Sequence, residues 1–88
     1  MANKDPVRQA SQPPRLARVR EPLWAVKFES QLMTCELRYH GTHGVEYRLF
    51  HNNEFVKGRG FATRELAVNA AAVVLKEFED EGWVRFEA

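Results

Sequence analysis

The sequence predicts an α+β domain in which a four-stranded antiparallel meander is followed by one C-terminal helix packed on one face of the sheet. Two patterns carry this prediction. From Leu23 to Val56 apolar and polar residues alternate, which is the period of half-buried antiparallel strands. From Thr63 to Glu81 apolar residues recur every three or four positions instead, which is the period of an amphipathic helix.

Length and composition indicate one domain behind a tail. The 88 residues, 44% hydrophobic and 28% charged, are typical of a single globular domain. Residues 1–22 hold few large apolar side chains, so we expect a disordered basic tail over 1–22 and a folded domain over 23–88. The tail has five basic and two acidic side chains, whereas the domain has eight basic and ten acidic side chains. A body this small buries only about 60% of its unfolded surface, so dimerisation would stabilise it.

The first two strands are expected to form a hairpin. A two-residue turn at 30–31 would place Val26 opposite Cys35 and Phe28 opposite Met33, with all four side chains on the apolar face.

The second and third strands are joined by the Gly-Thr-His loop at 41–43. The register that this loop implies keeps one face apolar and sets opposite charges beside each other on the other face. The expected pairs are Tyr39 with Val45, Leu37 with Tyr47, Arg38 with Glu46, and Glu36 with Arg48.

The fourth strand is expected to follow a turn at Asn52-Asn53, because asparagine tolerates the positive φ of such turns. This turn would pair Leu49 with Val56 and Phe50 with Phe55.

The helix is expected to begin after Thr63 as N-cap and to run to about Glu81, with Gly82 as a left-handed stop. Its apolar stripe holds Leu66, Ala70, Val74 and Phe78, flanked by Ala67, Ala71 and Leu75. The segment after it, with Trp83, Val84 and Phe86, fits either a short fifth strand or a flap over the core. The predicted core consists of Trp24, Val26, Phe28, Leu37, Tyr47, Leu49, Val56, Leu66, Val74 and Phe78.

Signals of catalysis are scarce. The chain has no Gly-rich phosphate loop, no nucleophile elbow and no convincing carboxylate pair, so we expect a non-enzymatic protein without a cofactor. His40 and His43 are the nearest approach to a metal site, but two histidines alone favour a solvated turn. Cys35 is expected to be a small core hydrophobe, and His51 a strand-end residue.

The single cysteine and the lack of a long apolar run or a signal-type N-terminus predict a cytoplasmic protein that does not enter a membrane.

The polar face of the sheet has two interpretations. Basic residues interleaved with exposed aromatics suit single-stranded nucleic acid. Alternatively, glutamates on the same face neutralise that charge and the aromatic pair is a homodimer contact. The residues concerned are Lys27, Arg38, Arg48, Lys57, Arg59, Phe50 and Phe55, with Glu29, Glu36 and Glu46. The acidic helix end, Glu77–Glu81, is expected to be a solvated face, with a basic partner or the chain's own tail as alternatives.

Residues 41–78, with the Gly-Thr-His loop, the Gly58-Arg-Gly60 stretch and the small-residue helix, resemble the second half of a double-stranded RNA-binding domain. The resemblance implies that His43 enters a minor groove and that Arg64 contacts phosphates. No counterpart of that fold's first helix precedes Cys35. A second resemblance, to short uncharacterised bacterial proteins, is carried by Trp24, Cys35–Gly41, Gly44–Glu46 and Phe61–Arg64, and it implies no activity.

The sequence therefore predicts a small binding module associated with single-stranded nucleic acid or RNA, and a protein-interaction module or homodimer as the alternative. The predicted nucleic-acid-binding residues are Arg48, Phe50, Phe55, Lys57 and Arg59, with His43 and Arg64 added by the resemblance.

Overall fold

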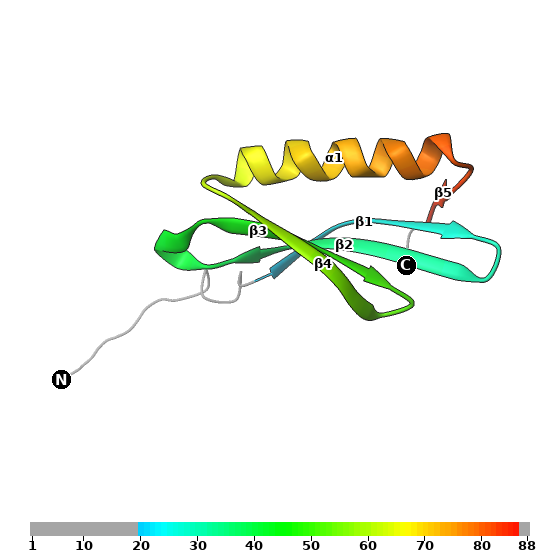
Figure 1. The fold of residues 1–88 in the computed structure, drawn as a ribbon, viewed down its shortest axis with the longest axis horizontal. Coiled ribbons are helices and arrows are strands. Elements are labelled where there is room, and N and C mark those ends of the chain that lie inside the picture. Colours follow the sequence, from blue (N-terminus) through cyan, green and yellow to red (C-terminus); the bar gives the residue numbers. More distant parts are fainter. Residues whose placement is uncertain (1–19, 87–88) are drawn as a thin grey trace.

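The computed structural model describes residues 20–86, which form a five-stranded antiparallel sheet with one helix along one face (Figure 1). The order across the sheet is β4-β3-β2-β1-β5, so the predicted meander and C-terminal helix are confirmed. The elements are β1 (Arg20–Phe28), β2 (Gln31–Tyr39), the 3-10 turn η3 (Gly41–His43), β3 (Val45–His51), β4 (Glu54–Phe61), α1 (Arg64–Asp80) and β5 (Val84–Arg85).

The β2–β3 hairpin has the predicted register at each of the four expected pairs, from Glu36 with Arg48 to Tyr39 with Val45. Its loop is closed by the backbone N–H of His40, which donates to the carbonyl of Gly44 over 2.9 Å. Gly41 and Gly44 both have positive φ, which a Cβ would disfavour. The apolar face and the glycine turn specify this hairpin, and its register sets opposite charges opposite each other, although the ion pairs Glu36–Arg38 and Glu46–Arg48 run along each strand.

The β3–β4 hairpin confirms the turn but not the whole register. Asn52 and Asn53 have φ of 50° and 71°, and Phe50 lies opposite Phe55 as predicted. A β-bulge after this pair then sets Lys57 opposite Leu49. The extra residue, Val56, is 51% exposed, so its assignment to the core was wrong.

The β1–β2 hairpin turns one residue earlier than predicted. Phe28 pairs with Gln31, and Glu29 takes up the positive φ of the turn, 56°. Val26 therefore faces Met33 rather than Cys35. The register moves by two residues, which keeps the same side chains on the apolar face.

The start of β1 also corrects the predicted boundary of the tail. Arg20 pairs with Arg38, so residues 20–22 belong to the sheet. The rest of the predicted tail, residues 1–19, lies outside the described residues. A bulge between Pro22 and Trp24 reverses the alternation and sets Glu21 opposite Leu37, on the helix side of the sheet.

Helix α1 rests on the sheet through a narrow line of small residues. Ala67 and Ala71 are fully buried, and Leu75 is nearly so. Thr63 is the N-cap, as predicted, because its hydroxyl accepts the N–H of Leu66 over 3.2 Å. Gly82, with φ of 103°, confirms the left-handed stop.

The rotation of the helix explains one error in the predicted core. Leu66 precedes Ala67 by one residue, or about 100° around the axis, and it is 51% exposed. Phe28 is also wrong as a core residue, since it lies at the end of β1 and is 36% exposed. The buried core comprises Val26, Met33, Cys35, Leu37, Val45, Tyr47, Leu49, Ala67, Ala71 and Leu75, with Trp24, Val74 and Phe78 packed against it.

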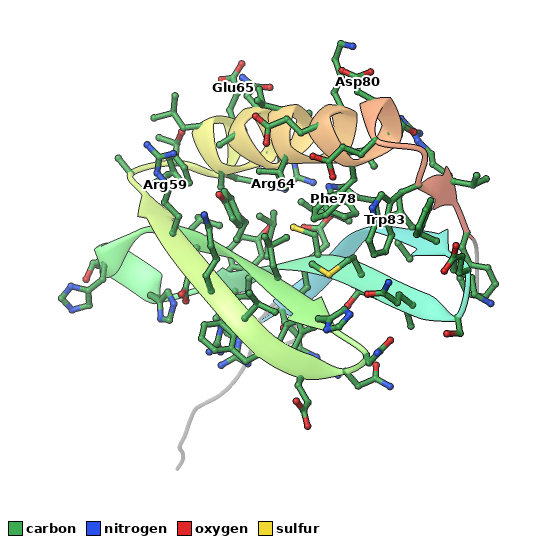
Figure 2. All side chains as sticks on the ribbon, turned by 45° about the vertical axis from the view of Figure 1, so that its right-hand side comes forward. Arg59, Arg64, Glu65, Phe78, Asp80 and Trp83 are labelled. Carbon is green, nitrogen blue, oxygen red and sulfur yellow. The ribbon has the colours of Figure 1, made fainter. Side chains whose placement is uncertain are left out.

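The C-terminal segment forms the fifth strand rather than a flap. Val84 and Arg85 pair with Lys27 and Val26 of β1. Trp83, just before this strand, lies between α1 and the sheet beside Phe78 (Figure 2). Its ring centroid is 5.2 Å from that of Phe78 and 5.6 Å from that of Phe28. The sheet edge and the helix end are therefore held by one aromatic cluster.

Candidate functional site

The face of the sheet opposite α1 is covered by no other described element (Figure 1), and we call it the open face. Strand alternation and the paired registers place its residues. They are Arg20 and Lys27 of β1, Thr34, Glu36 and Arg38 of β2, Glu46, Arg48 and Phe50 of β3, and Phe55, Gly58 and Gly60 of β4.

Three of the predicted site residues come together on the open face. The rings of Phe50 and Phe55 meet edge to face, with centroids 5.9 Å apart. The guanidinium carbon of Arg48 lies 4.3 Å from the centroid of the Phe55 ring. Phe55 remains 50% exposed, so part of an aromatic surface is open to a ligand.

Two glutamates bind the arginines of this face, as the alternative interpretation expected. Glu36 lies 4.0 Å from Arg20 and 3.9 Å from Arg38. Glu46 lies 3.9 Å from Arg48 and 2.9 Å from the Nε2 of His40. The third glutamate of that interpretation, Glu29, lies instead in the β1–β2 turn.

The positive groups of the open face nevertheless outnumber the negative ones. Among the described residues of this face, four are cations and two are carboxylates: Arg20, Lys27, Arg38 and Arg48 against Glu36 and Glu46. The side chains of Glu36 and Glu46 are 17% and 23% exposed, those of Arg48 and Arg38 are 24% and 35% exposed, and that of Arg20 is 66% exposed. Arg20 therefore presents its guanidinium group to the solvent, whereas Arg48 is about as buried as the carboxylate of Glu46 beside it.

Several polar atoms in this layer are buried without a hydrogen-bond partner. They are the Oε2 of Glu36 and the Nε atoms of Arg38 and Arg48. The ion pairs at 3.9–4.0 Å are longer than a hydrogen bond. The arginine side chains can therefore re-aim toward an anionic ligand at little loss of existing bonds.

A hollow of about 430 Å³ opens beside the bulge of β1. Its lining includes Pro22, Ala25, Thr34 and Phe86. The ammonium group of Lys27 lies 4.5 Å from the centroid of the Phe86 ring, next to this hollow. The open face thus has a second place where an aromatic ring and a cation lie together.

Lys57 and Arg59 do not belong to this surface. The bulge at Val56 sets them opposite Leu49 and Tyr47, on the helix side of the sheet. Figure 2 shows Arg59 on that side of β4, and its guanidinium lies 5.2 Å from the Phe61 ring. The prediction that both cations share a face with Phe50 and Phe55 was wrong, because a bulge reverses the alternation.

The two residues assigned through the RNA-binding resemblance lie at the loop end of the sheet. His43 is exposed in η3. Arg64 donates from Nη2 to Oε2 of Glu21 over 2.8 Å and from Nε to the Tyr39 hydroxyl over 3.1 Å. These hydrogen bonds, first of all those to Glu21, raise the pKa of Arg64 above its usual range. Arg64 therefore joins the start of α1 to the sheet.

Chemistry at Cys35 is suppressed by its surroundings. Burial, and to a lesser extent the charge of Glu36, raises the pKa of its thiol to about 12. Within residues 20–86, no three His, Cys, Asp or Glu side chains gather as a metal site would require. In the same part of the chain no helix is long and apolar enough to cross a membrane.

Two residues near the site, Arg20 and Phe86, were not predicted from the sequence. Arg20 was assigned to the tail, because the bulge after Pro22 breaks the alternation that would have extended the strand. Phe86 joins the surface only because β5 pairs with β1, and its residues fitted a flap equally well. Neither position carries a sequence signal that would have identified it.

Comparison of the chain with protein-family models, curated proteins and solved structures finds no match.

Proposed function

We propose that this protein is a non-enzymatic binding module whose open sheet face binds single-stranded nucleic acid. The observation that supports this most is the exposed Phe55 ring, paired with Phe50 on an uncovered sheet face where cations outnumber carboxylates. Stacking on an aromatic ring suits any base, and the neighbouring cations suit the phosphates between bases.

Each group on the face has a role in this proposal. Phe55 stacks on one base, with Phe50 supporting its ring from the edge. Arg48 and Arg38 leave their long contacts to the glutamates and pair with phosphates. No atom lies within 4 Å of the position that a Cβ would take at Gly60. The nucleic-acid strand can therefore approach the sheet closely at this residue.

The hollow beside β1 extends the same surface. A second base would enter it against Phe86, with Lys27 beside that ring. The ligand would then run across the strands from β4 to β1. This path fits a strand of a few unpaired nucleotides better than a duplex, whose bases are already stacked.

The test is fluorescence anisotropy of labelled single-stranded oligouridylate and oligothymidylate, and of duplex RNA, titrated with the full chain at low and moderate salt. We expect saturable binding of the single strands that weakens as salt is added. Phe55→Ala should weaken binding about tenfold or more, since one stacked base contributes about 1–3 kcal/mol. Arg48→Ala should weaken it less and reduce the salt dependence.

Lys76→Ala is the matched control, because this cation lies on α1 beside Asp80 and away from the open face. Unchanged affinity in Phe55→Ala and Arg48→Ala would place any binding outside the open face and refute the proposal. Tighter binding of the duplex than of single strands would favour instead the role that the resemblance implies for His43 and Arg64.

A second candidate, a homodimer through the open face, is favoured by the ion pairs of Glu36 and Glu46, since mixed charges can complement a second copy. Light scattering of the full chain at high concentration separates the two. A dimer that Phe55→Glu dissociates, with no affinity for oligonucleotides, would replace the first candidate by the second.

We place this function in the reducing environment of the cytoplasm. The thiol of Cys35 is free and buried, as in proteins that are kept reduced.

A further inference from the structure

The residues of the open face form rows that run across the strands, because cross-strand partners on one face lie side by side. From β4 to β1, the first row consists of Phe55, Phe50, Thr34 and Ala25. The second row consists of Gly58, Arg48, Glu36 and Pro22. The first row is thus uncharged, and the charged pair Arg48 and Glu36 lies in the row beside it.

The hollow of about 430 Å³ lies in the first row, where the side chains are small. Ala25 and Thr34 are part of its lining. Phe86 supplies an aromatic wall, because its backbone N–H donates to the carbonyl of Ala25 over 2.9 Å and keeps it next to β1. Glu36 reaches the lining from the second row. This hollow therefore combines a ring with a carboxylate, whereas the ring of Phe55 lies beside a guanidinium group.

The carboxylate of Glu36 has hydrogen-bonding capacity that the protein leaves unused. Its Oε2 atom is buried and has no hydrogen-bond partner. Its ion pairs with Arg20 and Arg38, at 4.0 and 3.9 Å, are longer than hydrogen bonds. An ionised carboxylate only accepts hydrogen bonds. A base that enters this hollow is therefore stabilised by donors on its edge and destabilised by acceptors.

The bases differ in the donors that their base-pairing edges present. Guanine has N1–H and the N2 amino group side by side, so a carboxylate can accept two parallel bonds from it. Adenine and cytosine have one amino group next to an acceptor nitrogen. Uracil and thymine have one N–H between two carbonyl oxygens, which a carboxylate repels. The hydroxyl of Thr34 can also donate to O6 of guanine. Guanine is thus the base whose edge matches this lining.

We infer that the hollow beside β1 is a guanine subsite and that Glu36 determines its specificity. This inference rests on the proposed function, since the guanine reaches the hollow as part of a strand bound along the first row. The base stacks on Phe86, and its N1–H and N2 amino group donate to Glu36. When Arg38 turns to a phosphate, it leaves its long contact with Glu36, and the carboxylate is available to the base.

The test uses fluorescence anisotropy with the full chain and labelled RNA octamers. One octamer is all uridine, and the others carry a single guanosine, inosine, adenosine or cytidine at the fourth position. We expect the guanosine octamer to bind at least about fivefold more tightly than the uridine octamer, which is the low end for a bidentate base contact. Inosine lacks the N2 amino group and should lose most of this gain. Adenosine and cytidine should gain little.

Two matched variants test the role of Glu36. Glu36→Gln removes the charge and turns one acceptor into a donor, so the ratio of the two dissociation constants, uridine over guanosine octamer, should fall to about one. Glu46→Gln is the control, because it removes the other carboxylate of the open face, which contacts Arg48 and His40. Both variants lose one negative charge, so a general gain in affinity is common to both. Only Glu36→Gln should change the ratio.

NMR of the wild-type protein locates the guanine without any variant. The amide signals of Ala25 and Thr34 should shift more with the guanosine octamer than with the uridine octamer. The inference is overturned, while the proposed function stands, if the octamers bind and are weakened by Phe55→Ala but guanosine, inosine and uridine bind alike. It is equally overturned if Glu36→Gln keeps the preference or if these two amides respond alike to both octamers. If no octamer binds, the proposed function fails and this inference fails with it.

Discussion

Cys35 shows how the sheet governs the properties of one side chain. Its native pKa of about 12 lies above the 9.0 of an ordinary thiol, so the unfolded chain loses this proton first as pH rises. The contribution of Cys35 to stability is thus intact below about pH 9 and is lost progressively toward pH 12. Relative to Cys35→Ala, the free energy of unfolding should fall by up to about 1.4 kcal/mol per pH unit in that range.

Urea denaturation of both proteins at pH 8, 9 and 10 measures this difference. The Cys35→Ala variant will be less stable at each pH because of its cavity, but only the slope against pH matters. Parallel curves for the two proteins would show that the thiol titrates alike in the native and unfolded states.

Gly58 is a second residue whose identity the surroundings require. A Cβ at Gly58 would collide with the carboxylate of Glu46, whereas one at Gly60 would meet no atom within 4 Å. We expect Gly58→Ala to displace Glu46 from its contacts with His40 and Arg48 and to lower the stability by about 1 kcal/mol. Gly60→Ala is the matched control. An equal loss of stability in both variants would mean that any Cβ at this end of β4 is costly, whether or not it meets Glu46.

At the scale of elements, the N-terminus of α1 depends on one hydroxyl. Thr63 accepts the Leu66 N–H, and removing such a cap costs about 1 kcal/mol. Thr63→Ala should lower the free energy of unfolding by that amount, and Thr63→Ser should restore most of it. Thermal denaturation followed by circular dichroism measures both. A Thr63→Ser variant as unstable as Thr63→Ala would show that the methyl group, rather than the hydroxyl, matters.

The elements and the β2–β3 register could be predicted, because alternation, turn chemistry and charge pairing agree there. The β2–β3 register is fixed twice, by the apolar face and by Arg38 and Arg48 opposite Glu46 and Glu36. The two bulges, at Leu23 and Val56, could not be predicted. A bulge needs only one extra residue and leaves the alternation plausible on either side of it, so nothing local reveals it.

These two bulges account for the difference between the predicted and the observed site. The bulge at Val56 moves Lys57 and Arg59 from the open face to the helix side. The bulge at Leu23 brings Glu21 to the helix side, where it holds Arg64. The aromatic pair on the open face could be predicted because it precedes the β4 bulge in the hairpin.

At the scale of the whole molecule, α1 is attached to the sheet at both ends. Its start is held by the bonds of Arg64 to Glu21 and Tyr39, and its end by Trp83 among the rings of Phe28 and Phe78. The middle rests on alanines, which bury little area per residue. We therefore expect the two ends to supply much of the energy that keeps the helix on the sheet.

Trp83→Ala should lower the free energy of unfolding by about 2 kcal/mol, because the half-buried aromatic cluster loses a ring. Val84→Ala is the control. This side chain is exposed on the edge strand β5, so its removal should have little effect. Thr63 lies about 30 Å from Trp83 along the helix. In the double variant Thr63→Ala, Trp83→Ala, the two losses of stability should therefore add to within about 0.5 kcal/mol. Urea denaturation of the single and double variants measures this. A combined loss well below the sum would mean that one damaged end already releases the whole helix, so that α1 docks as a single all-or-none unit.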